Sequence, residues 1–141
     1  MMIVTSLAIL VLVGLYYVYW YYRVHVYAWY TGFPKPKHGV ALDRNVMVSM
    51  PDGTLLATDV YRPKLPGKYP VVLLRTPYNK SGSEHRYGHL GQLFASQGYV
   101  FVVQDVRGKY GSQGQFYPYA YEALDGHTTV TWAGEAPWSN G

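Results

Sequence analysis

Several polar residues in this chain have types and spacings that suggest catalysis, and a serine between glycines is the first to consider. Ser112 lies in Gly111-Ser112-Gln113-Gly114. A nucleophile elbow requires Gly-x-Ser-x-Gly at a strand-to-helix turn, where glycines permit the sharp bend that exposes the hydroxyl. Here the residue two positions before the serine is Tyr110, and Gly114 opens no predicted helix. We therefore predict a structural loop serine rather than a nucleophile.

Histidines that could work with other ligands or acids come in two spacings. Asp125 and His127 are two residues apart on a predicted helix. Side chains at that spacing point in different directions, so the pair does not suggest a catalytic triad. His85 and His89 have the i, i+4 spacing that can present two imidazoles to one metal, but no carboxylate pattern completes a zinc site. We expect a loop histidine beside a helix start and no metal or cofactor site.

The remaining acidic candidates occur in turn patterns. Asp105 and Arg107 are close enough in sequence for a local ion pair or a turn brace. Asp52 lies in Pro51-Asp52-Gly53, where an aspartate commonly forms the turn by accepting hydrogen bonds from the backbone. We assign neither aspartate to catalysis.

The elements that must position these residues indicate an α/β protein. Residues 71–74 and 99–103 are continuous apolar runs rich in β-branched side chains, as in parallel strands covered by helices on both faces. Between them Leu90, Leu93 and Phe94 share one helical face, and Gly98 suits a helix C-terminus. Strand, helix and strand predict a right-handed crossover.

Function in such sheets gathers in the loops at the carboxyl ends of the strands. The predicted loops are residues 75–80 and 105–114.

Two further elements flank this crossover. Residues 46–50 and 55–61 surround a turn that contains Asp-Gly, which predicts a β-hairpin. Three polar residues in its second strand predict that one face of the hairpin is wet: Thr58, Asp59 and Tyr61.

A last helix is expected at residues 119–133. Four of its side chains are predicted to point inward: Tyr121, Leu124, Thr128 and Trp132.

Composition excludes several classes of protein. Hydrophobic residues make up 49% of the 141 and charged residues 14%, so the chain is not a disordered polar polymer. Of the 12 basic residues, Arg23, Lys35 and Lys37 precede His38, which leaves nine against eight acidic residues in the rest. The net charge of +4 therefore gives no reason to expect nucleic acid binding. Cysteine is absent, which removes disulfides and thiolate metal sites.

The N-terminal segment predicts a membrane anchor. Residues 1–22 contain no charged side chain, and about 20 residues at ~1.5 Å each cover a ~30 Å hydrocarbon core. Residues 16–22 are mostly tyrosine and tryptophan, which settle at the membrane interface. We expect residues 3–22 to contact the membrane in a single pass. A cleaved signal peptide with a site near 26–28 and a buried core helix are the alternatives.

Residues 23–44 are predicted to be a juxtamembrane linker, because two prolines at 34 and 36 exclude a continuing helix there. Basic residues follow the apolar segment and none precedes it. The positive-inside rule therefore favours a cytoplasmic C-terminal domain.

Five blocks in residues 45–141 together resemble one enzyme family. They are 50–63, Arg75-Thr76-Pro77-Tyr78, 104–108 with 111–116, Glu122 with Asp125-Gly126, and 137–141. In this order they are similar to the start of α/β-hydrolases of the X-Pro dipeptidyl-peptidase and cocaine-esterase type. The resemblance implies that residues 45–141 are the N-terminal part of an α/β-hydrolase: an antiparallel hairpin leading into a parallel sheet.

The resemblance also implies a function. The family hydrolyses esters or amides with a serine nucleophile, then an aspartate and a histidine in chain order. It implies that Tyr78 donates its hydroxyl to the oxyanion hole, where such a donor stabilises the transition state. A surface tyrosine is the other interpretation in a chain with 16 tyrosines. No residue present matches a triad member. We therefore expect the serine beyond Gly141, in a Gly-x-Ser-Tyr-x-Gly elbow, and a chain that is inactive alone.

Two other functions remain open. A complete 141-residue chain could be a non-catalytic, membrane-anchored interaction module. In that case the strand ending at Asp105, which we expect to pair with the nucleophile strand, would expose an apolar edge that promotes aggregation. A soluble, monomeric segment 38–141 that melts cooperatively would support the module, whereas we expect insoluble or molten material. An acyltransferase of the same fold would share the acyl-enzyme, and this part of the sequence does not separate it from a hydrolase.

Overall fold

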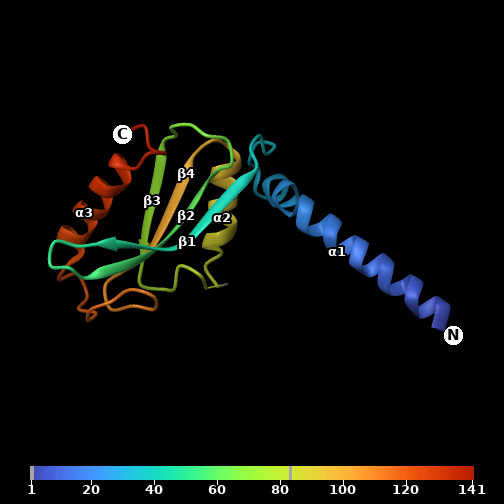
Figure 1. Cartoon of the computed structure of the whole chain (residues 1–141), viewed down its shortest axis with the longest axis horizontal. Coiled ribbons are helices and arrows are strands. Elements are labelled where there is room, and N and C mark those ends of the chain that lie inside the picture. Colours follow the sequence, from blue (N-terminus) through green and yellow to red (C-terminus); the bar gives the residue numbers. More distant parts are fainter. Residues whose placement is uncertain (1, 83) are drawn as a thin grey trace. The chain divides into compact units, whose positions relative to one another are not determined.

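A computed structural model describes residues 2–82 and 84–141 of the chain (Figure 1). The chain forms two compact units, Met1–Pro36 and Lys37–Gly141. The first unit consists of helix α1, Met2–Thr31. The helix ends where Gly32 takes a positive φ of 74° and the Phe33 N–H donates a 2.8 Å hydrogen bond to the Ala28 carbonyl. Part of the segment predicted as a linker is thus helical, because its first residues carry no helix breaker before Gly32.

No helix among the described residues is both long and apolar enough to cross a membrane. The anchor predicted at residues 1–22 includes Met1 and the side chains of residues 2–7 and 21, which lie outside the described part of the chain. Membrane anchoring therefore stays a prediction.

The second unit is built on one four-stranded mixed sheet in the order β1-β2-β4-β3 (Figure 1). Its strands are β1 Val40–Ser49, β2 Leu55–Pro63, β3 Val71–Thr76 and β4 Val100–Asp105, and its helices are α2 Tyr87–Ser96 and α3 Glu122–Glu135. Strands β1 and β2 are antiparallel, β2 and β4 are antiparallel, and β3 and β4 are parallel. The predicted hairpin and the predicted parallel crossover are both confirmed.

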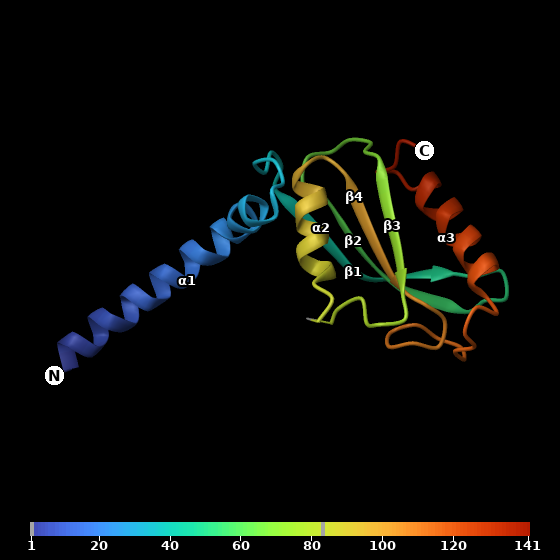
Figure 2. The same ribbon diagram turned by 180° about the vertical axis from the view of Figure 1, so that it is seen from behind.

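Helices cover opposite faces of the sheet, as the continuous apolar strands predicted (Figure 2). On one face Phe101 and Val103 of β4 pack against α2, and the ring of Phe94 stacks on Phe101 at 5.5 Å between centroids. On the other face the alternate residues Val100 and Val102 belong to a cluster that includes Trp132 of α3. This alternation along one strand separates two apolar cores.

The hairpin has no wet face along β2, contrary to the prediction. Thr58, Asp59 and Tyr61 are all at most 5% exposed. Strand β2 lies between β1 and β4, and its polar side chains have partners: Thr58 Oγ1 accepts a 3.0 Å hydrogen bond from Gln104 Nε2. Polar residues in a strand indicate a wet face only when no buried partner is available to them.

The inward face of α3 matches the prediction only in part: Trp132 packs on the sheet as predicted. Tyr121 and Leu124 are exposed, whereas Asp125, Thr129 and Ala133 are buried. Beside Trp132 the helix presents polar residues to the sheet, because the sheet beneath them carries polar groups. Thr129 Oγ1 donates a 3.0 Å hydrogen bond to Gln104 Oε1. Hydrophobic periodicity does not detect a helix that packs through hydrogen bonds and ion pairs.

Strand β4 does not have the free edge that the sequence predicted for it, because β2 and β3 pair with its two sides. Strand β3 ends the sheet order instead. Beside its start, Tyr69 N–H donates a 2.9 Å hydrogen bond to the Trp138 carbonyl, and the Asn140 N–H donates a 3.2 Å bond back to the Tyr69 carbonyl. The bridge between Tyr69 and Ser139 is parallel.

Two helix glycines allow the packing of α2 to be tested. A Cβ on Gly91 would lie 2.5 Å from Cδ2 of the buried Tyr61 ring, whereas a Cβ on Gly134 in α3 would meet no heavy atom within 4 Å. We expect Gly91→Ala to lower the free energy of unfolding by about 1–3 kcal/mol through overpacking, despite the better helix propensity of alanine. We expect the matched control, Gly134→Ala, to raise it by up to about 1 kcal/mol. Urea unfolding of both variants measures the difference, and equal midpoints would show that α2 does not contact Tyr61 this closely.

Candidate functional site

The loops after β3 and β4 begin at the same edge of the sheet. The two strands are parallel neighbours in which Thr76 is opposite Asp105, so both chains leave the sheet at one level. The Val106 N–H donates a 3.0 Å hydrogen bond to the Thr76 carbonyl and keeps the chains together one residue further. The loops predicted to carry function are therefore adjacent (Figure 1).

Tyr78 lies in the first of these loops, two residues after the end of β3. Its N–H donates a 3.0 Å hydrogen bond to Thr76 Oγ1, which fixes the turn at Pro77. The tyrosine side chain is 61% exposed. Its ring lies 5.2 Å from that of His85, measured between centroids. The phenol is thus accessible on a loop whose backbone is anchored to the strand end.

A buried ion pair anchors the same loop on the other side of Tyr78. The side chains of Lys80 and Asp59 are 3% and 2% exposed, and Lys80 Nζ lies 2.8 Å from Asp59 Oδ1. The ammonium also donates a 2.7 Å hydrogen bond to Asn45 Oδ1, at the bulge of β1. Two partners in this geometry satisfy a buried cation that would be costly alone. The sequence did not predict this pair, because its members are 21 residues apart and no local spacing marks it.

Asp105 braces both loops, but not with the partner suggested by the sequence. Its Oδ1 accepts a 2.7 Å hydrogen bond from the Lys80 N–H, and its Oδ2 a 3.3 Å bond from the Gly111 N–H. Burial raises the pKa of the Asp105 carboxyl, and these two backbone donors oppose the rise. The turn brace predicted for Asp105 is confirmed, whereas an ion pair with Arg107 does not form, because that guanidinium binds other carboxylates.

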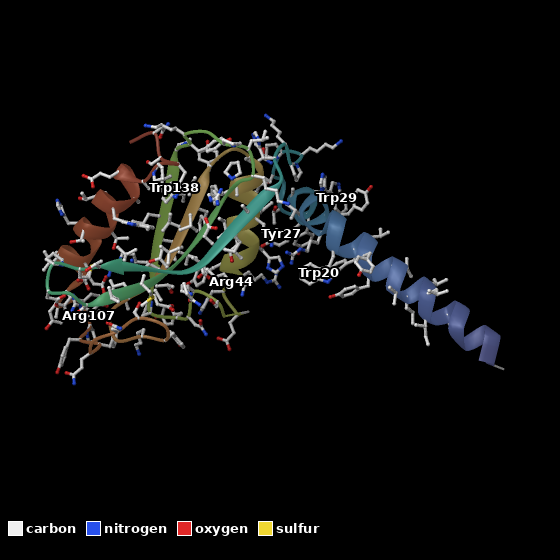
Figure 3. The ribbon with its side chains drawn as sticks, viewed as in Figure 1. Trp20, Tyr27, Trp29, Arg44, Arg107 and Trp138 are labelled. Atoms are coloured by element: carbon white, nitrogen blue, oxygen red, sulfur yellow. The ribbon has the colours of Figure 1, made fainter. Side chains whose placement is uncertain are left out.

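Arg107 joins the hairpin turn to α3 (Figure 3). Its Nε and one terminal nitrogen donate 3.0 Å and 2.8 Å hydrogen bonds to the two oxygens of Asp125, which is fully buried. Its other terminal nitrogen lies 2.6 Å from Asp52 Oδ2. The hydrogen bond from Arg107 holds the pKa of Asp52 well below its usual value, and the two carboxylates raise the pKa of Arg107. Asp52 also accepts the 3.0 Å turn bond from the Thr54 N–H, as predicted for a turn former.

Ser112 has the structural role that the sequence predicted. Its hydroxyl donates a 2.6 Å hydrogen bond to the Asp105 carbonyl and accepts a 2.9 Å bond from the Ala57 N–H. Strand β2 extends beyond the end of β4 at this point, so the loop serine satisfies a backbone donor that the sheet leaves free. A hydroxyl engaged on both sides by the backbone is not presented to a substrate.

The histidine candidates are also placed apart from any triad. His127 is exposed on α3, whereas Asp125 on the same helix is buried against Arg107, so the two point in different directions as predicted. His85 lies in the loop just before α2, and His89 lies within that helix. In the described ranges, 2–82 and 84–141, no group of three or more histidine, cysteine or acidic side chains could hold a metal ion. This edge of the sheet offers an accessible hydrogen-bond donor, the phenol of Tyr78, on a loop fixed at both sides.

Known proteins share both the sequence and the fold of this unit. The profile of the X-Pro dipeptidyl-peptidase (S15) family matches residues 52–141. The cocaine esterase of Rhodococcus sp. (strain MB1 Bresler) is 41% identical over 101 residues, which cover 69% of this chain and 17% of the esterase.

Solved structures agree. A CocE/NonD family hydrolase from Staphylococcus aureus superposes with a TM-score of 0.62 at 27% identity, over 72% of this chain and 21% of its own. An alpha-amino acid ester hydrolase superposes with a TM-score of 0.61 at 33% identity, over 78% and 22%. The chain thus spans about a fifth of the length of these relatives, and its mixed sheet with covering helices is part of an α/β-hydrolase fold. Since the family profile matches more than half of its residues, the chain belongs to the X-Pro dipeptidyl-peptidase (S15) and cocaine-esterase family of hydrolases.

Proposed function

We propose that these residues form the N-terminal part of a serine hydrolase that cleaves ester or amide bonds through an acyl-enzyme. Family membership supports hydrolysis, and the position of Tyr78 at the carboxyl end of β3 is the observation that carries the assignment of its role. In this proposal a serine from the longer protein attacks the substrate carbonyl carbon. The leaving alcohol or amine takes a proton, and water then hydrolyses the acyl-serine.

Tyr78 contributes by donating its phenolic proton to the oxygen on which negative charge develops. A donor aimed at this position stabilises the transition state more than the ground state, because the carbonyl oxygen becomes an oxyanion only during the reaction. The ring is accessible, and its loop is fixed by Thr76 on one side and Lys80 on the other. Such preorganisation is what an oxyanion donor requires, since it then needs no rearrangement during the reaction.

The start of a further strand supports the position of the serine in this proposal. Trp138–Asn140 hydrogen-bond to Tyr69 in the parallel sense, on the side of β3 away from β4. A strand that continues from this bridge rises ~3.3 Å per residue, as β3 does, and reaches the level of Thr76 after about seven residues. The nucleophile strand in our proposal is therefore a neighbour of β3 rather than of β4. Its carboxyl end, and the serine that follows, come next to Tyr78.

The proposed role of Tyr78 can be tested in the longer protein. We expect Tyr78→Phe to lower kcat by ~10²–10³ with little change in KM, because the lost hydrogen bond acts on the transition state. Hydrolysis of a p-nitrophenyl ester and of an X-Pro p-nitroanilide measures the effect. The control is Tyr119→Phe, which removes the phenol of a tyrosine that is 89% exposed, and it should leave kcat unchanged. A normal kcat in Tyr78→Phe would reject the oxyanion role, and a longer protein without a Gly-x-Ser-x-Gly elbow after residue 141 would reject the serine mechanism.

We further propose that residues 3–22 anchor the enzyme in a membrane, with residues 37–141 on the cytoplasmic side. The absence of charge in residues 1–22, the aromatic cluster at 16–22 and the basic residues that follow support this proposal.

The anchor is tested by fractionation of cells that make the protein. We expect it to remain in the membrane pellet after extraction with alkaline carbonate, because an inserted apolar helix is not held by electrostatic contacts. Deletion of residues 3–22 should move the protein to the supernatant, whereas substitution of Lys35 and Lys37 by alanine should leave it in the pellet. Release of the unmodified protein by carbonate would contradict the anchor.

A further inference from the structure

The ring of Tyr78 is one end of a stack of three aromatic side chains. Its centroid lies 5.2 Å from that of His85, with 46° between the ring planes. The imidazole also stacks on Tyr87 at 5.5 Å and 30°. His85 is therefore in ring contact with both the tyrosine of the β3 loop and the first residue of α2.

Both ends of the stack are tied to one hydroxyl at the end of β3. Thr76 Oγ1 accepts the 3.0 Å hydrogen bond from the Tyr78 N–H and is 3.0 Å from the Tyr87 hydroxyl. Thr76 itself is buried, at 2% exposure. The backbone of Tyr78 and the ring of Tyr87 are thus fixed to the same point, and His85 is in ring contact with both tyrosines.

Different contacts hold the backbone and the side chain of Tyr78. The Thr76 bond and the Lys80 anchors fix the loop, but they leave rotation about the side-chain torsions of Tyr78 open. Tyr78 is 61% exposed, and its ring packs against His85, a contact that restrains this rotation. An oxyanion donor loses effect when its hydroxyl samples other directions, since catalysis depends on donors already in place.

We infer that His85 is a positioning residue that holds the Tyr78 ring in the orientation in which its phenol can serve as oxyanion donor. This inference rests on the proposed function. The imidazole acts through its flat surface and not through proton transfer, so another aromatic ring at position 85 replaces it. The interaction free energy of a stacked aromatic pair is large enough to change the population of this orientation of the Tyr78 ring about two- to tenfold.

The stack itself can be measured without activity, by NMR of the longer protein with ¹³C-labelled histidine imidazoles. We expect the imidazole C–H signals of His85 to lie upfield of those of the exposed His127, because ring currents of the two tyrosines shield them. His85→Phe identifies the signals by removing them. Tyr78→Leu should move them downfield, whereas Tyr78→Phe, which keeps the ring, should not. Unshifted His85 signals in the starting protein would overturn the inference directly.

The catalytic consequence is measured in the longer protein. His85→Ala should lower kcat about two- to tenfold with KM changed less than twofold, and His85→Phe should restore kcat to at least half of its starting value. His127→Ala removes an exposed histidine from α3 and should change neither constant.

The outcomes separate this inference from the proposed function. If Tyr78→Phe lowers kcat but His85→Ala does not, Tyr78 is the donor and the positioning role of His85 is wrong. If His85→Phe lowers kcat as much as His85→Ala does, the imidazole acts by other chemistry than stacking and the inference is again wrong. If Tyr78→Phe has no effect, the proposed oxyanion role fails and the positioning role fails with it, even where NMR shows the stack.

Discussion

The buried ion pair of Lys80 with Asp59 holds together the part of the molecule on which the rest of this account depends. It joins β2 to the loop after β3, and the same ammonium reaches Asn45 in β1. Removing one member of such a pair leaves an uncompensated buried charge, which typically costs about 3–5 kcal/mol. A lysine two residues after Tyr78 in sequence therefore fixes the loop to strands that are distant in the chain.

A second set of charges, beneath α3, joins this helix to the hairpin turn. Arg107 binds both oxygens of the buried Asp125 and reaches Asp52 in the hairpin turn. The helix faces the sheet through these groups, with Thr129 on Gln104, and through the apolar packing of Trp132. The unit thus combines an apolar core under α2 with a layer under α3 in which apolar contacts of Trp132 lie beside hydrogen bonds and ion pairs. Polar contacts of this kind specify one arrangement, because each donor has a defined acceptor.

The sequence predicted those parts of the fold that depend on local patterns. The Asp-Gly turn at Gly53, the two valine-rich strands and the glycine at position 98 each have a physical requirement that a few neighbouring residues reveal. The structural role of Ser112 followed from the absence of an elbow pattern around it. In each case the signal lies within about ten residues of the element that it predicts.

What the sequence did not predict depends on contacts across the sheet. The sequence predicted an exposed Asp59, because its partner Lys80 lies on another loop. It did not predict that Asp125 and Thr129 of α3 face inward, because the groups that they contact are polar. The order of the strands was also needed to show that β3, not β4, ends the sheet. For the candidate site, family resemblance singled out Tyr78, whereas its anchors at Thr76 and Lys80 and its stack with His85 required coordinates.

The most direct test of the central claim is amide hydrogen exchange in a chain that lacks both members of the ion pair. The double variant Lys80→Met with Asp59→Leu removes both charges together, so it avoids an orphaned carboxylate and should remain folded. We predict that the amides of Tyr78 and Lys80 exchange at least ~10-fold faster in this variant, because the loop loses its side-chain anchor, while the amides of β4 keep their protection. Unchanged protection at Tyr78 and Lys80 in a folded double variant would contradict the claim that this ion pair positions the loop.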